Sequence, residues 1–97
     1  MNSRRKGAAG ERELAKVLRS WQQYCGANGD ADVVGLPGIH IECKRVERLD
    51  LYAAMAQAKH DANANELPAV IHRRNNSDWL VTMRLEEFMP IYREWEA

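Results

Sequence analysis

The segment 39–44 constrains the fold most strongly, because apolar and polar residues alternate along Ile-His-Ile-Glu-Cys-Lys. Successive side chains of a β-strand point to opposite faces of the sheet, so the alternation predicts a strand with one polar and one apolar face. The polar face carries His40, Glu42 and Lys44. A Gly-Leu-Pro-Gly turn at 35–38 precedes this strand, and the short β-branched run 31–34 precedes the turn. Together these segments predict a β-hairpin.

Helical periodicity marks two further segments. In 8–21 the apolar residues recur at i, i+3, i+4 and i+7, which predicts an amphipathic helix. These residues are Leu14, Val17, Leu18 and Trp21. A second helix is predicted from an Asp50 N-cap to about Ala62, with a face of small side chains suited to close packing on a sheet.

The C-terminal third predicts two strands and a helix. Segments 68–73 and 78–83 have strand composition and are joined through Asn75-Asn76-Ser77, whose short polar residues suit a hairpin turn. Apolar residues continue at helical spacing from Leu85 to Trp95, but Pro90 lacks an amide donor and is expected to divide the segment. We therefore expect a short turn and then a helix from near Pro90. The predicted order is α-β-β-α-β-β-α, an α/β sandwich.

Length and composition favour one soluble domain. A chain of 97 residues is long enough for a single core and too short for two, so residues 1–97 are taken as one domain with a basic, mobile N-terminal arm at 1–7. No secretory leader and no membrane-spanning stretch is evident, and the two cysteines form no CxxC. We expect a cytoplasmic protein of a bacterial, archaeal or phage-infected cell, without a membrane partner. The cysteines and histidines also form no zinc-binding spacing.

The polar strand face supplies groups that phosphodiester hydrolysis needs. That reaction requires a divalent cation on hard oxygen ligands, an oriented water and positive charge near the phosphate. Glu42 and Lys44 supply a carboxylate and an ammonium side by side, and the carbonyl of Cys43 could add a ligand. Mg²⁺ usually takes one or two carboxylates, and Asp32 is the second candidate, with Asp30 as its alternative. Mn²⁺ is expected to substitute for Mg²⁺.

An acid-x-Lys pair alone is weak evidence for such a site. The chain has 4 lysines and 14 acidic residues, so roughly 0.6 pairs of this kind are expected by chance. The predicted hairpin around Asp32, Glu42 and Lys44 makes the pattern more specific. The alternative interpretation is an exposed strand face with a cross-strand salt bridge.

The chain resembles the PD-(D/E)XK nucleases, and within them the small Holliday junction resolvases of archaea and phages. The resemblance rests on Arg5-Lys6-Gly7 leading into Glu11-Arg12-Glu13-Leu14, then Asp32-Val33-Val34, then Ile41-Glu42-Cys43-Lys44. It implies a restriction-endonuclease-like mixed sheet flanked by helices. It also implies metal ligation by Asp32, Glu42, the Cys43 carbonyl and a first-helix glutamate, with Lys44 positioning water or stabilising the phosphate. Gln57 is a further catalytic candidate by resemblance.

The first helix offers two glutamates for that role. Placed 100° apart around the helix, Glu11 lies about 55° from the centre of the apolar stripe and Glu13 about 105° away. Glu11 is therefore expected to face the sheet more directly, where an unpartnered carboxylate would be costly. Only some ten residues separate this helix from Asp32, so Glu11 could serve its own site or that of a partner subunit.

We expect a structure-selective endonuclease that cuts branched or four-way DNA as a homodimer, because a junction is resolved by two symmetry-related nicks. The alternatives are a flap, mismatch or restriction-type nuclease of the same superfamily, a catalytically silent DNA-binding module, and a small interaction domain. Basic residues are the candidates for phosphate contacts. They are Arg4, Arg5, Lys6, Arg45, Arg48, Arg73 and Arg74.

Overall fold

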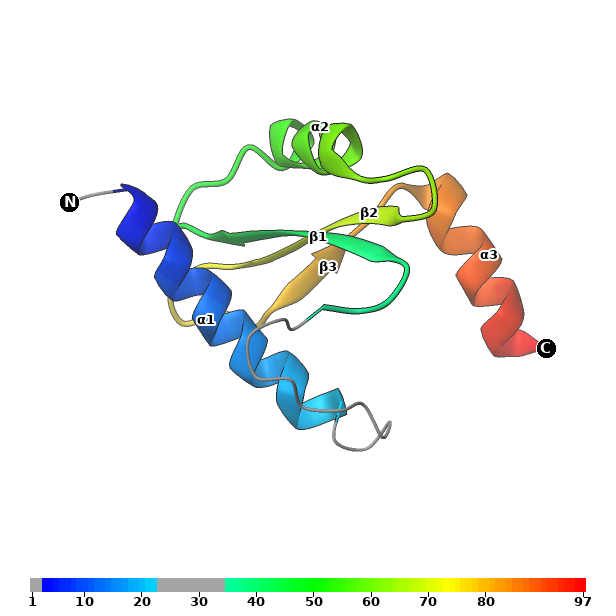
Figure 1. The fold of residues 1–97 in the computed structure, drawn as a ribbon, viewed down its shortest axis with the longest axis horizontal. Helices are drawn as coiled ribbons and strands as arrows, with labels where there is room; N and C mark the ends of the chain where they lie inside the picture. Colours follow the sequence, from blue (N-terminus) through cyan, green and yellow to red (C-terminus); the bar gives the residue numbers. More distant parts are fainter. Residues whose placement is uncertain (1–2, 23–34) are drawn as a thin grey trace.

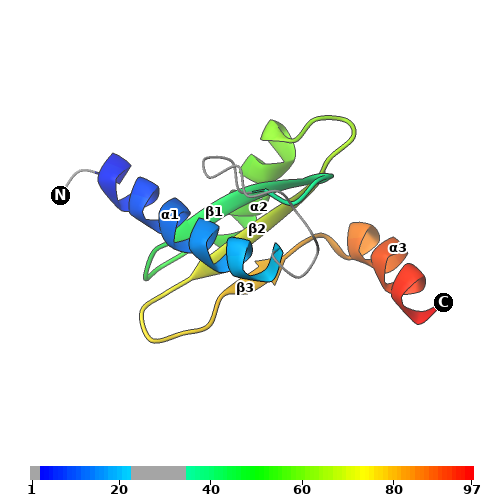
Figure 2. The ribbon, with the colours of Figure 1, turned by 60° about the horizontal axis from the view of Figure 1, so that its bottom comes forward.

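The fold is a small mixed β-sheet covered by one helix on each face. A computed structural model of the chain describes residues 3–22 and 35–97, the side chains of residues 3–6 and 22 excepted. The elements are α1 (Ser3–Gln22), β1 (Ile39–Arg45), α2 (Leu51–Asp61), β2 (Leu67–Arg73), β3 (Leu80–Thr82) and α3 (Leu85–Glu96). In Figures 1 and 2, α1 and α2 lie on opposite sides of the sheet and α3 projects beyond one end of it.

The described sheet has the order β1-β2-β3, with β1 parallel to β2 and β3 antiparallel to β2. Since parallel strands need a crossover, α2 connects β1 to β2 across one face. The central strand β2 is buried on both faces, as its run Pro68-Ala69-Val70-Ile71 indicates. β1 pairs on one side with β2 along its whole length, and in the described sheet it is an edge strand.

The core consists of two thin layers. Above the sheet, Ala54 and Ala58 of α2 pack on Val70, all three at most 4% exposed. Below it, the opposite face of β2 buries Ala69 and Ile71, and α1 buries Leu14. Small residues on α2 bring the helix axis close to the sheet, as the sequence predicted.

Gly10 allows the equally close approach of α1. A Cβ atom added to Gly10 would lie 2.5 Å from the Cβ atom of Arg45 in β1. Any side chain at this position would therefore force the helix and the strand apart, because a Cβ atom cannot move independently of its backbone. Gly10 is the point at which α1 crosses β1, and it places Glu11 and Glu13 beside the strand.

Turn chemistry explains where β1, α2 and β3 begin. Ile39 donates a 2.9 Å backbone hydrogen bond to Leu36, with Pro37 and Gly38 at the turn's centre and Gly38 at φ 85°. This is the pattern of a type II turn, in which the third residue must be left-handed. The Asp50 carboxylate caps α2 by accepting from the Ala53 amide at 3.0 Å. Asn76 takes φ 57° in the β2–β3 connection, where asparagine is tolerated.

Three expectations need correction or restriction. Helix α1 begins at Ser3, so the basic segment expected to form a separate arm continues the helix. Helix α3 begins at Leu85 and contains Pro90, so the expectation that Pro90 divides this segment was wrong. The proline removes one hydrogen bond to the Glu86 carbonyl, and α3 has no buried residue, so water can replace that bond. The predicted strand 31–34 and the loop before it lie outside the described residues.

Among the described residues, no helix is long and apolar enough to cross a membrane. Several large apolar side chains remain exposed instead. Trp21 is 69% exposed and Trp95 is 79% exposed. The exposed residues of α3 form one aromatic row, since the ring centroids of Phe88 and Tyr92 are 6.3 Å apart and those of Tyr92 and Trp95 are 5.8 Å apart.

Candidate functional site

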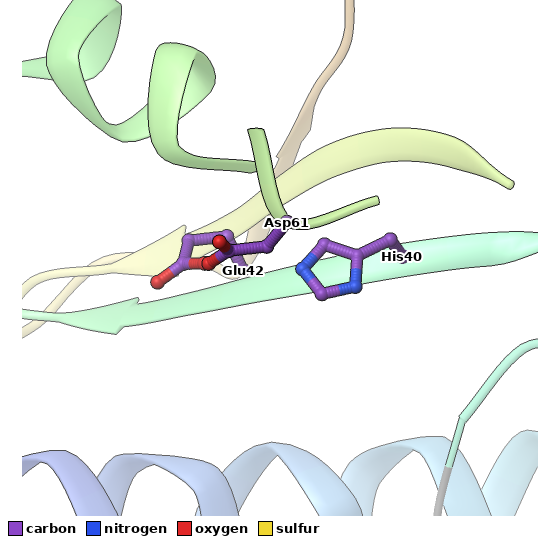
Figure 3. Close-up of side chains that lie close together, drawn as sticks. All are labelled: His40, Glu42 and Asp61. Carbon is purple, nitrogen blue, oxygen red and sulfur yellow. The ribbon is translucent and has the colours of Figure 1, made fainter. Parts of the chain in front are cut away.

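Strand β1 carries different chemistry on its two faces, as its alternation predicted. Glu42 and His40 lie on the face toward α2, close to Asp61 at the end of that helix (Figure 3). Arg45 lies on the face toward α1, where its Nε donates to Glu13 at 3.1 Å. The strand therefore presents a polar face with one carboxylate to α2 and an apolar and basic face to α1.

His40, Glu42 and Asp61 form a compact cluster. One ligand atom of each, a ring nitrogen or a carboxylate oxygen, lies within 4.8 Å of the other two. In Figure 3 a ring nitrogen of His40 points along β1 toward the two carboxylates. Nε2 of His40 is buried and has no hydrogen-bond partner. The cluster thus joins an unsatisfied nitrogen to two acidic groups.

Asp61 is held in place by its own helix. Gln57, one turn earlier on α2, donates from Nε2 to Asp61 Oδ2 at 2.7 Å, and Nδ1 of His60 lies 3.1 Å from Oδ1. These hydrogen bonds, that of Gln57 above all, lower the pKa of the Asp61 carboxyl, and the charge of His40 contributes in the same direction. Asp61 is therefore anionic at neutral pH, and Gln57 is linked to the cluster through it.

Lys44 lies beside the cluster on the same face of β1. Its Nζ is 3.7 Å from Oε1 of Glu42, and the Lys44 side chain is 37% exposed while that of Glu42 is 21% exposed. The ammonium therefore neighbours the half-buried carboxylate and still reaches solvent. Such a pair can position an anion next to a carboxylate-bound cation.

A pocket of about 640 Å³ lies beside β1 and extends to α1. Glu42, Cys43 and Asp61 line it from the sheet side, and Glu11 lines it from α1. Since β1 is an edge strand in the described sheet, carboxylates on its two faces can share one pocket around the strand edge. Glu11 and Glu42 therefore both border this pocket.

Cys43 has no role as a nucleophile in this pocket. Burial above all, and then the negative charges of Glu11, Glu13 and Glu42, raise the pKa of its thiol to about 11 against a smaller lowering by Lys44. The thiol is therefore protonated at neutral pH, and thiolate is the reactive form. Only the backbone carbonyl of Cys43 remains a candidate for the site.

Glu13 is occupied elsewhere. Its carboxylate accepts from Arg45 Nε at 3.1 Å and from Arg73 Nη1 at 2.8 Å, which ties α1 to β1 and β2. Glu11 is exposed and lines the pocket. The expectation that Glu11 faces the sheet more directly was wrong, because the helix buries Gly10 and Leu14 while Trp21, which helped to define the stripe, is exposed.

The basic residues expected to contact phosphates have different surroundings. Arg45 and Arg73 are paired with Glu13, and Arg45 also donates to Asn75 Oδ1 at 2.8 Å and lies 3.5 Å from Glu47. Arg74 donates to Ser77 at 3.3 Å, and Arg48 is exposed. The side chains of Arg4, Arg5 and Lys6 lie outside the described residues. Asp32 and its alternative Asp30 also lie outside them.

Asp61 was not predicted as a site residue from the sequence. It ends α2, where the helix dipole disfavours a negative charge, and it follows Gln57 by four residues, so the two share one helix face. The sequence feature that could have indicated Asp61 is an acidic residue at the C-terminal end of a predicted helix. Its pairing with His40 and Glu42 depends on the crossover of α2 over β1, which spacing alone does not reveal.

Comparison of the chain with protein-family models, with curated proteins and with solved structures found no match in any of the three.

Proposed function

We propose that the chain is a Mg²⁺-dependent DNA endonuclease of the PD-(D/E)XK type. The observation that carries the proposal is the Glu42–Lys44 pair on β1, 3.7 Å apart, beside a pocket that Glu11 enters from α1. Two carboxylates that line one accessible pocket, with an ammonium paired to one of them, are groups that metal-assisted phosphodiester hydrolysis uses.

The donors fit a hard cation. Glu42 is half-buried and Glu11 lines the same pocket, so both offer carboxylate oxygens, the kind of ligand that Mg²⁺ prefers. In the proposed site Glu42, Glu11, the Cys43 carbonyl and Asp32 hold the ion. Mg²⁺, when bound, supplies Lewis-acid polarisation of a phosphoryl oxygen. The Lys44 ammonium donates hydrogen bonds to the phosphate or to the attacking water, and Gln57 orients Asp61 beside the site.

Within this class, we favour branched DNA as the substrate and a homodimer as the active form, as the resemblance to Holliday junction resolvases implies. The Lys44 side chain is 37% exposed and therefore accessible to a substrate. The exposed row on α3 supports self-association, because Phe88, Tyr92 and Trp95 are 43%, 39% and 79% exposed. At 150–250 Å² per aromatic side chain, the three rings leave roughly 300 Å² uncovered, a large part of the ~800 Å² that each partner of a stable dimer buries.

The test compares a labelled four-way junction with a linear duplex of the same sequence, with Mg²⁺ or with chelator. Lys44→Ala should lower the rate of junction cutting by about 10² or more, because the charge near the phosphate is lost. Lys59→Ala, which removes an exposed lysine of α2, is the matched control and should cut like the parent.

The outcomes separate the alternatives. Equal cutting of both substrates would favour a flap, mismatch or restriction-type nuclease over a resolvase. Binding of DNA without cutting in any metal would indicate a silent DNA-binding module and overturn the enzymatic proposal. Binding to neither DNA would leave an interaction domain.

A further inference from the structure

The geometry points to a second kind of metal site, in which His40, Glu42 and Asp61 bind a borderline divalent cation of the Zn²⁺ type. Two of the three residues, His40 and Asp61, are not ligands in the Mg²⁺ site proposed above. The inference does not rest on nuclease activity, because it concerns what the free protein binds.

The orphaned nitrogen of His40 is the first argument. Nε2 is buried and makes no hydrogen bond, an arrangement that is unfavourable unless the atom has another partner. A ring nitrogen of His40 points toward the carboxylates of Glu42 and Asp61 (Figure 3). A metal ion between the three groups would satisfy the nitrogen and neutralise the two carboxylates together.

The distances allow such an ion. The three ligand atoms lie within 4.8 Å of one another. Zinc binds nitrogen and carboxylate oxygen at about 2.0–2.2 Å, which requires ligand atoms roughly 3.5 Å apart in a tetrahedron. Each side chain would move by about an ångström, and Asp61 is exposed at a helix end where such a movement meets little resistance. A fourth position would face the pocket that all three residues line.

The ligand set selects the class of metal. Mg²⁺ takes oxygen ligands in near-ideal octahedral geometry, whereas imidazole suits Zn²⁺, Ni²⁺ and Co²⁺. One imidazole and two carboxylates with an open position resemble the donor sets of three-ligand zinc sites. Glu42 belongs to both proposed sites, so Zn²⁺ bound here would compete with Mg²⁺ for that carboxylate.

Calorimetric titration of the untagged full chain with Zn²⁺, without DNA, tests the proposal. The parent should bind one ion per chain and bind Mg²⁺ far more weakly. His40→Ala and Asp61→Asn should each weaken Zn²⁺ binding by about tenfold or more, because each removes a direct ligand. His60→Ala is the matched control: its side chain is 84% exposed and contacts Asp61 but lies outside the cluster, so binding should remain near that of the parent.

Further variants separate this site from a thiolate site and from the nuclease site. Cys43→Ser should retain Zn²⁺ binding, which would rule out a thiolate ligand. Lys44→Ala should also retain Zn²⁺ binding, so loss of nuclease activity and loss of this site remain distinguishable.

Zn²⁺ should raise the melting temperature of the parent and not that of His40→Ala. Melting curves recorded in chelator report whether each variant folds. The proposal is overturned if the parent binds Zn²⁺ no better than Mg²⁺, or if His40→Ala and Asp61→Asn bind like the parent.

Discussion

Glu11 and Glu13 lie two residues apart on α1 and have separate tasks. Glu13 holds Arg45 and Arg73 with both carboxylate oxygens, whereas Glu11 lines the pocket beside β1. One glutamate therefore contributes to the attachment of the helix, and the other contributes charge to the candidate site. The two residues can be tested against each other because the same substitution at each should affect a different property.

Glu13→Gln should lower the free energy of unfolding by about 1 kcal/mol, since it weakens two partly exposed ion pairs between α1 and the sheet. Glu11→Gln should leave stability nearly unchanged and lower the rate of Mg²⁺-dependent cutting. Urea unfolding and the junction assay measure the two effects. The reverse result, a stable Glu13→Gln with no activity, would make Glu13 the site residue.

The thiol of Cys43 should react slowly in the folded protein. Its pKa is raised from 9.0 to about 11, so at pH 8 the thiolate fraction is about 100-fold smaller than in the unfolded chain. In a Cys25→Ser background, alkylation by iodoacetamide should be slower in the folded state by at least this factor. Because the thiolate is disfavoured in the folded state, the free energy of unfolding should fall as pH rises from 9 toward 11 and be unaffected by Cys43 below pH 9. Equal alkylation rates in the two states would contradict the buried environment of Cys43.

At the scale of elements, α1 and α2 are both held against the sheet by residues without large side chains. Ala54 and Ala58 are at most 4% exposed on α2, and Gly10 is buried where α1 crosses β1. The short distance between each helix and the sheet determines which polar groups of the helix contact polar groups of the strands. Asp61 reaches His40 and Glu42 only because α2 lies close to β1.

Gly10→Ala should lower the free energy of unfolding by about 1–3 kcal/mol, because the added Cβ atom would lie 2.5 Å from Arg45 Cβ and push α1 away from β1. Gly7→Ala is the matched control on the same helix. Nothing lies within 4 Å of a Cβ atom at Gly7, so alanine there should stabilise the protein by about 0.5–1 kcal/mol through helix propensity. Denaturant unfolding compares them, and two changes of the same sign would contradict the proposed crossing point.

Elements with strong local signals were predictable from the sequence. Alternation predicted β1, the Asp50 cap and the small-residue face predicted α2, and the Asn75–Ser77 connection predicted the antiparallel pair β2 and β3. The prediction that Pro90 divides this segment was wrong, because a proline lowers helix stability but does not forbid a helix. In α3 the carbonyl that loses its amide donor can bind water instead. Of the candidate site, Glu42 and Lys44 were predictable from one strand. Asp61 was not, because its position depends on a crossover between elements.

At the scale of the whole molecule, the covered sheet and the projecting helix α3 differ in how they are stabilised. The sheet is packed on both faces, whereas α3 has no buried residue. An amphipathic helix gains most of its stability from packing of its apolar face. A second copy of the chain, which carries the same row of aromatic side chains, can supply that packing in an isologous interface.

Phe88→Glu should therefore shift the protein from dimer to monomer in sedimentation velocity runs at micromolar concentration, because it places a charge in the aromatic row. Tyr52→Glu is the control, since Tyr52 is 91% exposed on α2 and lies outside the row. Junction cutting should change from paired nicks to single nicks in the Phe88→Glu variant. A parent that sediments as a monomer at all concentrations would remove α3 as the self-association surface.

Because α3 buries no residue, the residues that pack the sheet layer and the exposed aromatic row lie in separate stretches of the chain. Substitutions between Leu85 and Glu96 can accumulate without opening cavities in the core, and substitutions under α2 leave the aromatic row intact. The exposed surface of α3 can therefore change while the residues around β1 stay as they are.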